Sequence, residues 1–270
     1  METSILDLPP PAAEHRLVYG TLSTQFADLR VPDGAGPHPV VIIIHGGYWR
    51  VRYGLEYLGH LCERLRAHGY ATWNVEYRRI GEEGGGWPNT FLDVASAADA
   101  LRDIAVNYSL DHRRVFALGH SAGGHLASWL ASRSRIPVGS ILYADSPTQL
   151  RGVISLAGVL DLHLAYEWKL SNGAASELLG GSPLNYPERY DAASPAALLP
   201  TGVPHLLIHG HKDDNVPHKL SRRYAQRARE AGDEVRLLSP RNATHFDVVD
   251  PRSPRWPPVE SAILTFLADH

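Results

Sequence analysis

The chain contains 270 residues, of which 44% are hydrophobic and 20% are charged, and these values argue against a disordered protein. Its formal net charge of −3 provides no basic excess for a phosphate backbone, which argues against nucleic acid as the main partner. The single cysteine, Cys62, excludes an internal disulfide framework and a cysteine-based structural zinc site.

The first 19 residues carry no recognisable targeting signal, because three acidic residues and three prolines replace the basic and apolar stretches that such a signal needs. The longest strongly apolar run, Val-Val-Ile-Ile-Ile at 40–44, is too short to span a bilayer. These observations predict a cytoplasmic protein without a membrane partner.

Short apolar runs alternate with helical patterns along the chain, which is typical of a mostly parallel α/β sheet flanked by helices. The runs are rich in β-branched residues and poor in charged ones, which suits strands that are buried on both faces. The predicted core strands are residues 40–44, 71–76, 115–118, 153–156, 205–208 and 235–238. Weaker antiparallel edge strands are expected at 17–22 and 25–31.

Apolar residues at helical spacing fill the gaps between these strands and predict amphipathic helices. The helices are expected over residues 55–65, 92–105, 126–130, 220–231 and 259–267. Asn89 is predicted to cap the second helix, because its side chain can accept from a free N–H group of the first turn. Cys62 lies on the apolar stripe of the first helix and is interpreted as a small buried hydrophobe.

The segment at about 160–200 interrupts this alternation with tandem glycines and several prolines. A structureless loop of that length is uncommon inside a compact domain, so short helices are expected there. We interpret the chain as one domain, residues 1–270, in which this segment forms a small helical cap over one end of the sheet.

The strongest motif is Gly-His-Ser-Ala-Gly-Gly at 119–124, which follows a predicted strand and precedes a predicted helix. A Gly-x-Ser-x-Gly sequence in that context is typical of a sharp turn that exposes a nucleophilic serine. The glycines avoid side-chain clashes where the strand turns into the helix. Ser121 is therefore the predicted nucleophile, and His120 beside it is expected to line the substrate pocket.

A second motif, His-Gly-Gly-Tyr-Trp at 45–49, directly follows the strand 40–44. Acyl transfer creates an oxyanion that must be met by preorganised N–H donors, and glycines allow a backbone to point its N–H groups inward. The expected donors are the N–H groups of Gly47, Tyr48 and Ala122.

A nucleophilic serine also needs a base and a residue that orients the base. Among 15 histidines, His245 is favoured because it follows the last predicted strand, although His211 and His218 are rivals. The acid is expected after the strand 205–208, where Asp213 and Asp214 compete.

Together these motifs resemble the α/β-hydrolase superfamily over nearly the whole chain. The sequence at 45–49 resembles the His-Gly-Gly-x-Trp motif of kynurenine formamidases and related small esterases, and 245–247 resembles their catalytic-histidine segment. The sequence at 45–49 is also similar to the His-Gly-Gly-Gly motif of hormone-sensitive-lipase-like esterases, with Tyr48 in place of the third glycine. In similar enzymes the acid lies three residues before the valine of a Val-Pro pair, which selects Asp213. The order Ser121, Asp213, His245 agrees with this superfamily.

The resemblance implies a serine hydrolase that acts on a small-molecule ester or aryl formamide without a cofactor or metal. Kynurenine formamidase is the specific alternative, and a non-catalytic ligand-binding protein is the alternative from another class. A homodimer is left open. Activity is expected to fall below roughly pH 6–7 as the catalytic histidine is protonated. Four aromatic side chains are expected either to form a pocket wall or simply to pack, namely Tyr48, Trp49, Tyr166 and Trp168.

Overall fold

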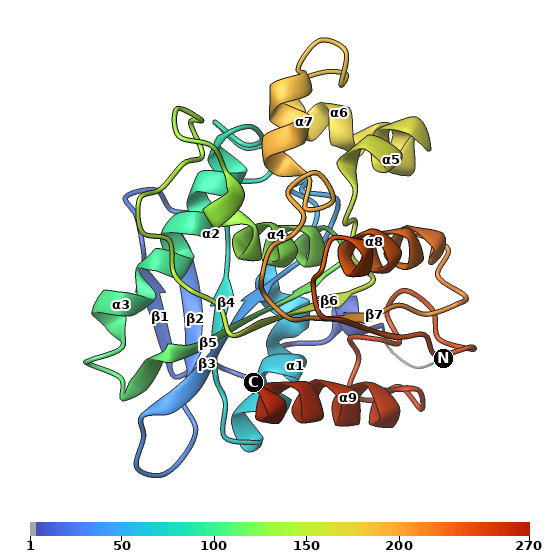
Figure 1. Cartoon of the computed structure of the whole chain (residues 1–270). Helices are drawn as coiled ribbons and strands as arrows, with labels where there is room; N and C mark the ends of the chain where they lie inside the picture. The colour runs from blue at the N-terminus through green and yellow to red at the C-terminus, as the bar shows by residue number, and fades with distance from the viewer. Residues whose placement is uncertain (1–3) are drawn as a thin grey trace.

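The computed structural model describes residues 4–270, and over that range its strands form one sheet in the order β1-β2-β4-β3-β5-β6-β7-β8 (Figure 1). The first two strands pair antiparallel to their neighbours, and the remaining pairs are parallel. The strands are β1 His15–Val18, β2 Phe26–Arg30, β3 His38–Ile44, β4 Ala71–Val75, β5 Leu110–His120, β6 Gly152–Leu156, β7 His205–Ile208 and β8 Val235–Leu238. The predicted mostly parallel α/β sheet is therefore confirmed, although β1 begins and ends earlier than predicted and β5 begins earlier.

Helices cover both faces of this sheet. They are α1 Gly59–Ala67, α2 Asn89–Asp99, α3 Leu101–Ile104, α4 Ala122–Ala131, α5 Leu162–Glu167, α6 Ala174–Leu179, α7 Pro187–Ala193, α8 Lys219–Glu230 and α9 Trp256–Asp269. Figure 1 shows α1 and α9 below the sheet and α2, α4 and α8 above it. Within residues 4–270, no helix is long and apolar enough to cross a membrane.

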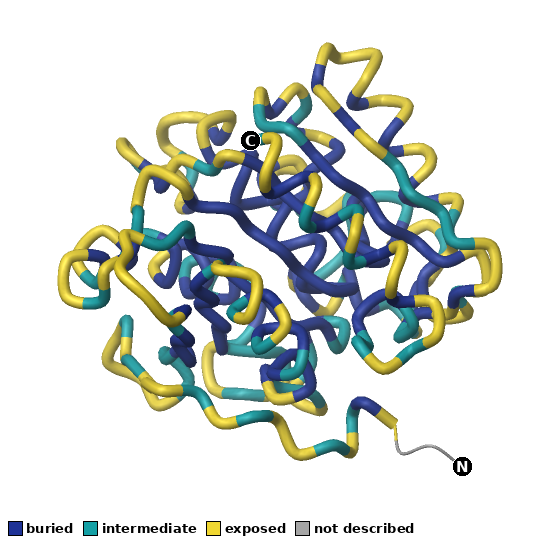
Figure 2. The backbone as a smooth tube through the Cα atoms, turned by 90° about the horizontal axis from the view of Figure 1, so that it is seen from below, coloured by how far each residue is buried: buried dark blue, intermediate teal, exposed yellow. Residues whose placement is uncertain are grey.

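The central strand β3 shows why its sequence is apolar without interruption. Val40, Ile42 and Ile44 face the core shared with α2, α4 and α8. Val41 and Ile43 face the opposite core under α1 and α9. Because successive side chains point to opposite faces, a strand covered on both sides needs an apolar residue at every position. Figure 2 shows that the centre of the molecule is buried and that exposed loops surround it.

The segment between β6 and β7 contains the three short helices α5, α6 and α7, which gather at the top of Figure 1. Buried residues of these helices join the core that also contains α2 and α4. Two further contacts fix the segment to α4: the Trp129 indole donates to the Ala192 carbonyl, and the His125 ring contacts the Ala193 carbonyl.

The predicted helix at 92–105 is broken into α2 and α3, and its expected cap is wrong. The residue before α2 is Pro88, with helical backbone angles and no side-chain bond to the helix. Asn89 is instead the first helical residue, and its amide donates to the Gly84 carbonyl at 2.9 Å. Asn89 therefore ties the glycine-rich loop to the helix.

Candidate active site

Ser121 lies at the turn between β5 and α4, with φ 57° and ψ −120°. A positive φ is uncommon for a residue with a side chain, and it presents the hydroxyl at the end of the sheet. The flanking glycines are required by contact with backbone atoms. A Cβ atom at Gly119 would lie 2.0 Å from the Gly123 carbonyl oxygen, and one at Gly123 would lie 2.0 Å from the Ile44 carbonyl oxygen.

We expect Gly123→Ala to lower the free energy of unfolding by about 3 kcal/mol, at the upper end of the usual cost of overpacking. The reason is that the clash is with the backbone of β3, which cannot rotate away. Chemical denaturation measures this change. Gly139→Ala is the control, because Gly139 has a positive φ but open space around it, so a loss of only about 1–2 kcal/mol is expected. Equal losses in the two variants would contradict the packing explanation.

The imidazole of His245 is bound to the carboxylate of Asp213. Nδ1 of His245 lies 2.7 Å from Oδ2 of Asp213, and both side chains are almost fully buried. The other oxygen of Asp213 accepts the backbone N–H groups of Asn215 and Val216 at 2.9 and 2.8 Å. Burial alone would raise the pKa of Asp213, but its hydrogen bonds outweigh burial and hold the pKa well below the usual range. Asp213 is therefore an anion that fixes the orientation of the ring.

Ser121 and His245 line one cavity of about 90 Å³. Its other lining residues are Leu6, Gly47, Tyr48, Tyr53, Tyr57, His120, Asn215 and Phe246. Within residues 4–270, neither the Ser121 hydroxyl nor Nε2 of His245 makes a hydrogen bond. Catalytic contacts of this kind commonly tighten only when a substrate is bound. The cavity thus holds an unengaged hydroxyl and an oriented imidazole.

Gly47 and Tyr48 bring backbone donors to the same cavity. Both have positive φ, 107° and 51°, and their N–H groups have no hydrogen-bond acceptor in the described part of the chain. The third expected donor is the N–H of Ala122, the first residue of α4, where helical N–H groups lack an intrahelical acceptor. The Tyr48 hydroxyl donates to the Asn215 carbonyl at 2.6 Å and so joins this loop to the loop of Asp213.

His120 lines the cavity and also connects two of its loops. Its Nε2 lies 3.0 Å from the carbonyl oxygen of His245, so this nitrogen carries the hydrogen. Burial and the nearby His245 ring lower the pKa of His120 to about 3, so the ring is neutral and its Nδ1 accepts from the Tyr57 hydroxyl at 2.9 Å. The Tyr57 oxygen in turn accepts the N–H of Gly46 at 2.8 Å. One directed chain of hydrogen bonds therefore links the loop of Gly46 to the loop of His245.

A second histidine, His209, lies beside the acid and was not predicted from the sequence. Nε2 of His209 lies 3.1 Å from Oδ2 of Asp213, and its Nδ1 lies 2.7 Å from the hydroxyl of Ser221. His209 precedes Asp213 by four residues, and this short spacing could have indicated that the two side chains meet. The rivals His211 and His218 stack on each other at 4.3 Å between ring centroids, and neither lines the cavity.

Of the four aromatic candidates for the pocket wall, Tyr48 lines the cavity and the other three lie elsewhere. Trp49 is buried in the core, where its indole N–H donates to His125 at 3.2 Å. Tyr166 packs against Tyr190, and Trp168 lies beneath the guanidinium of Arg223. The segment at 160–200 contributes none of the residues that line the cavity. Aromatic residue type alone did not reveal which way these side chains point.

Other side chains form the wall instead. The rings of Tyr53, Tyr57 and Phe246 surround the cavity, and Leu6 reaches it from the short helix η1, Ile5–Asp7. Across residues 4–270, no cluster of three or more histidine, cysteine, aspartate or glutamate side chains is arranged to hold a metal ion.

The strand order and the turn at Ser121 define an α/β-hydrolase fold, and solved structures support it. A truncated carbohydrate esterase from gut microbiota superposes with a TM-score of 0.81 at 19% identity, over 97% of this chain and 99% of that one. The propionate-bound esterase Est2 of Thermogutta terrifontis gives a TM-score of 0.76 at 23% identity, over 96% and 94%.

Residues 27–227 match the model of the BD-FAE family, and the chain therefore belongs to that family. Esterase LipC of Mycobacterium tuberculosis is 27% identical over 93% of this chain and 64% of its own length. A probable isoprenylcysteine alpha-carbonyl methylesterase, ICME, of Oryza sativa subsp. japonica is 28% identical over 94% and 63%. The chain thus spans less than two thirds of the length of these relatives.

Proposed function

We propose that this chain is a serine hydrolase that cleaves small carboxylic esters through an acyl-enzyme intermediate. Ser121 is the nucleophile, His245 the general base, and Asp213 the residue that orients the base. The proposal rests on one observation: a free hydroxyl, a carboxylate-bound imidazole and unpaired N–H groups meet at one cavity. The names of the relatives LipC and ICME, both esterases, support the same class of reaction.

In this mechanism, His245 takes the proton of Ser121 as the serine oxygen attacks the carbonyl carbon. The oxyanion that forms accepts hydrogen bonds from the N–H groups of Gly47, Tyr48 and Ala122. His245 then donates its proton to the leaving alcohol, which departs. A water molecule, deprotonated by the same imidazole, attacks the acyl-enzyme and releases the acid.

The size of the cavity favours a short acyl group. Its volume of about 90 Å³ is well below the roughly 300–1,000 Å³ of pockets that enclose drug-sized ligands. Leu6 and the aromatic residues Tyr48, Tyr53, Tyr57 and Phe246 line it. An acetyl or propionyl group fits such a space, whereas a long acyl chain would have to displace these side chains.

We expect kcat/KM for p-nitrophenyl acetate to exceed that for p-nitrophenyl octanoate by about tenfold or more, the order of discrimination that a tight apolar pocket provides. Initial rates across acetate, butyrate, hexanoate and octanoate measure the profile. Detergent-free conditions below the solubility limit of each ester are the control for aggregation. A preference for octanoate would contradict the short-acyl assignment.

Aryl formamides are the second candidate substrate class. The motifs at 45–49 and 245–247 favour them by resemblance, and a formyl group is the smallest acyl group that the cavity could receive. The reaction would differ only in its leaving group, an aniline nitrogen. Comparing kcat/KM for N-formylkynurenine with that for p-nitrophenyl acetate separates the two, and ester hydrolysis without formamide hydrolysis would remove this candidate.

A further inference from the structure

His209 is the first residue after β7, and its side chain is fully buried with both ring nitrogens in contact with polar groups. Nδ1 lies 2.7 Å from the hydroxyl oxygen of Ser221, and Nε2 lies 2.9 Å from the carbonyl oxygen of Val216. A carbonyl oxygen can only accept, so Nε2 carries a hydrogen. The same nitrogen lies 3.1 Å from Oδ2 of Asp213, so this N–H group is shared between a carbonyl and a carboxylate.

The two oxygens of Asp213 are held by different groups. Oδ1 accepts the backbone N–H groups of Asn215 and Val216, whereas Oδ2 faces Nδ1 of His245 at 2.7 Å. The backbone bonds alone would let the carboxylate turn about Oδ1, and such a turn would move Oδ2 out of line with the ring of the base. The contact of Oδ2 with His209 supplies a second fixed point, at the oxygen that orients the base.

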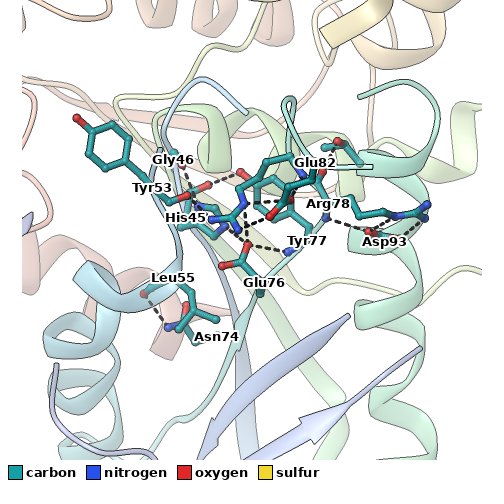
Figure 3. A network of polar contacts seen from close by, with 12 residues as sticks. His45, Gly46, Tyr53, Leu55, Asn74, Glu76, Tyr77, Arg78, Glu82 and Asp93 are labelled. Carbon is teal, nitrogen blue, oxygen red and sulfur yellow. Dashed lines mark hydrogen bonds and ion pairs between the residues drawn. The ribbon is translucent and has the colours of Figure 1, made fainter. Parts of the chain in front are cut away.

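The charge of Asp213 also depends on this contact. Another buried carboxylate, that of Glu76, meets the ring of His45 and lies 3.5 Å from the guanidinium of Arg79 (Figure 3). Among residues 4–270, no arginine or lysine pairs with Asp213 in this way. Burial alone would raise the pKa of Asp213, and the contact with His209 is the largest of the causes that lower it. His209 therefore favours the anion as well as its position.

The ring of His209 is itself anchored to rigid elements of the fold. Ser221, which holds Nδ1, is a buried residue of helix α8. The backbone N–H of His209 donates to the carbonyl of Leu238, the last residue of β8, at 3.0 Å. Asp213 by contrast lies in the loop between β7 and α8. Because groups supported by packed strands and helices are placed more precisely than groups on loops, His209 transfers the rigidity of the sheet to this loop.

We propose that His209 is a positioning residue that fixes Oδ2 of Asp213 where the ring of His245 needs it. This role rests on the proposed esterase function. His209 does not line the cavity, so it acts on the reaction only through the acid. The orientation of the base is thus set, through Asp213, by the end of β7 and by α8.

The role is tested by kinetics on p-nitrophenyl acetate, with turnover expressed per site titrated by a fluorophosphonate. His209→Leu is expected to lower kcat about tenfold, the effect of losing one contact of an N–H group with a charged acceptor. KM should stay close to that of the wild type, because His209 does not touch the substrate. His209→Gln should restore most of kcat, since its amide has two hydrogens and can serve both acceptors. Wild-type kcat in a folded His209→Leu variant, or equal losses in both variants, would overturn the role.

His205→Leu is the matched control. His205 is a fully buried histidine of the same strand, four residues earlier, and it also contacts α8, with Nε2 3.3 Å from the hydroxyl oxygen of Tyr224. Its Nδ1 lies 2.8 Å from the Val203 carbonyl, and it does not contact Asp213. Its kcat should match the wild type. A loss equal to that of His209→Leu would overturn the role, because disturbed packing between β7 and α8 would then explain both results.

The bond between His245 and Asp213 is observed directly by proton NMR. The hydrogen on Nδ1 of His245 should give a downfield signal, assigned by its absence in His245→Gln. We expect this signal to broaden through exchange with water in His209→Leu, because the carboxylate is then free to turn. It should stay sharp in His209→Gln and in His205→Leu. An identical signal in His209→Leu and the wild type would overturn the proposal.

Ser221→Ala keeps the proposal testable if His209→Leu does not fold. This smaller change releases the ring of His209 at Nδ1 and leaves Asp213 untouched. We expect kcat to fall about threefold, the effect of one neutral hydrogen bond, with broadening of the same proton signal. Unchanged kcat and an unchanged signal would overturn the anchoring. A wild-type chain that hydrolyses no ester would refute the proposed function, whereas the proton signal would still report whether His209 positions Asp213.

Discussion

Ser121→Ala is expected to lower kcat for p-nitrophenyl acetate on the order of 10⁶-fold, as when a nucleophile is removed from a serine triad. Without the hydroxyl no acyl-enzyme can form, and only the oxyanion donors and binding remain to lower the barrier. The substitution removes one buried oxygen from a turn whose backbone is fixed by its neighbours, so the fold should persist. Active-site titration with a fluorophosphonate should label the wild type once and this variant not at all.

Ser128→Ala is the matched control for this experiment. Ser128 lies on α4, the helix that begins directly after the nucleophile, and within residues 4–270 its buried hydroxyl has no hydrogen-bond partner. Its loss should leave both kcat and labelling unchanged. Near-normal turnover in Ser121→Ala would remove the nucleophile assignment, and absence of labelling in the wild type would favour a non-catalytic binding protein.

The parts of the site that could be predicted from sequence are those set by local geometry. The turn at 119–124 needs glycines because backbone atoms of the same turn and of β3 leave no room for a Cβ atom. His-Gly-Gly at 45–47 follows a strand end for a related reason, since its backbone must bend to present N–H groups. Parallel strands end at one edge of the sheet, so residues after β3, β5 and β7 were bound to meet there.

The parts that could not be predicted depend on contacts between distant segments. Tyr57 follows Gly46 by 11 residues, and nothing in its sequence neighbourhood marks a hydroxyl that joins two loops. Leu6 reaches the cavity only because the N-terminal segment packs beside the helix η2, Leu55–Leu58. Conversely, Trp49 directly follows an expected oxyanion donor in the sequence, yet its side chain is buried in the core. Its backbone has a positive φ of 59°.

Asp213→Asn is expected to lower kcat about 10⁴-fold, as in other triads in which an amide replaces the orienting carboxylate. An amide group that faces Nδ1 of His245 with its NH₂ forces the ring hydrogen onto Nε2, and Nε2 then cannot accept the proton of Ser121. The amide also carries no charge to stabilise the imidazolium that forms during the reaction. Steady-state kinetics between pH 6 and 9 measure the loss at each protonation state of the base.

The same variant should change how stability depends on pH. The pKa of Asp213 is lower in the folded chain than in the unfolded one, where an aspartate titrates near about 3.9. Its contribution to stability is therefore fully present above that value and is lost as the pH falls through the folded pKa. In acid denaturation, Asp213→Asn should lose less stability than the wild type below about pH 4.

Asp214→Asn is the control that decides which of two neighbouring aspartates, Asp213 or Asp214, orients the base. Asp214 is exposed, and in the described part of the chain its carboxylate accepts only the side-chain amide of Asn215, at 3.0 Å. Asp213 instead receives His245, His209 and two backbone N–H groups in a buried position. Removing a charge from Asp214 leaves all of these contacts in place, so kcat should stay within about twofold of the wild type, as expected for a surface substitution. A large loss in Asp214→Asn with a small one in Asp213→Asn would assign the orienting carboxylate to Asp214.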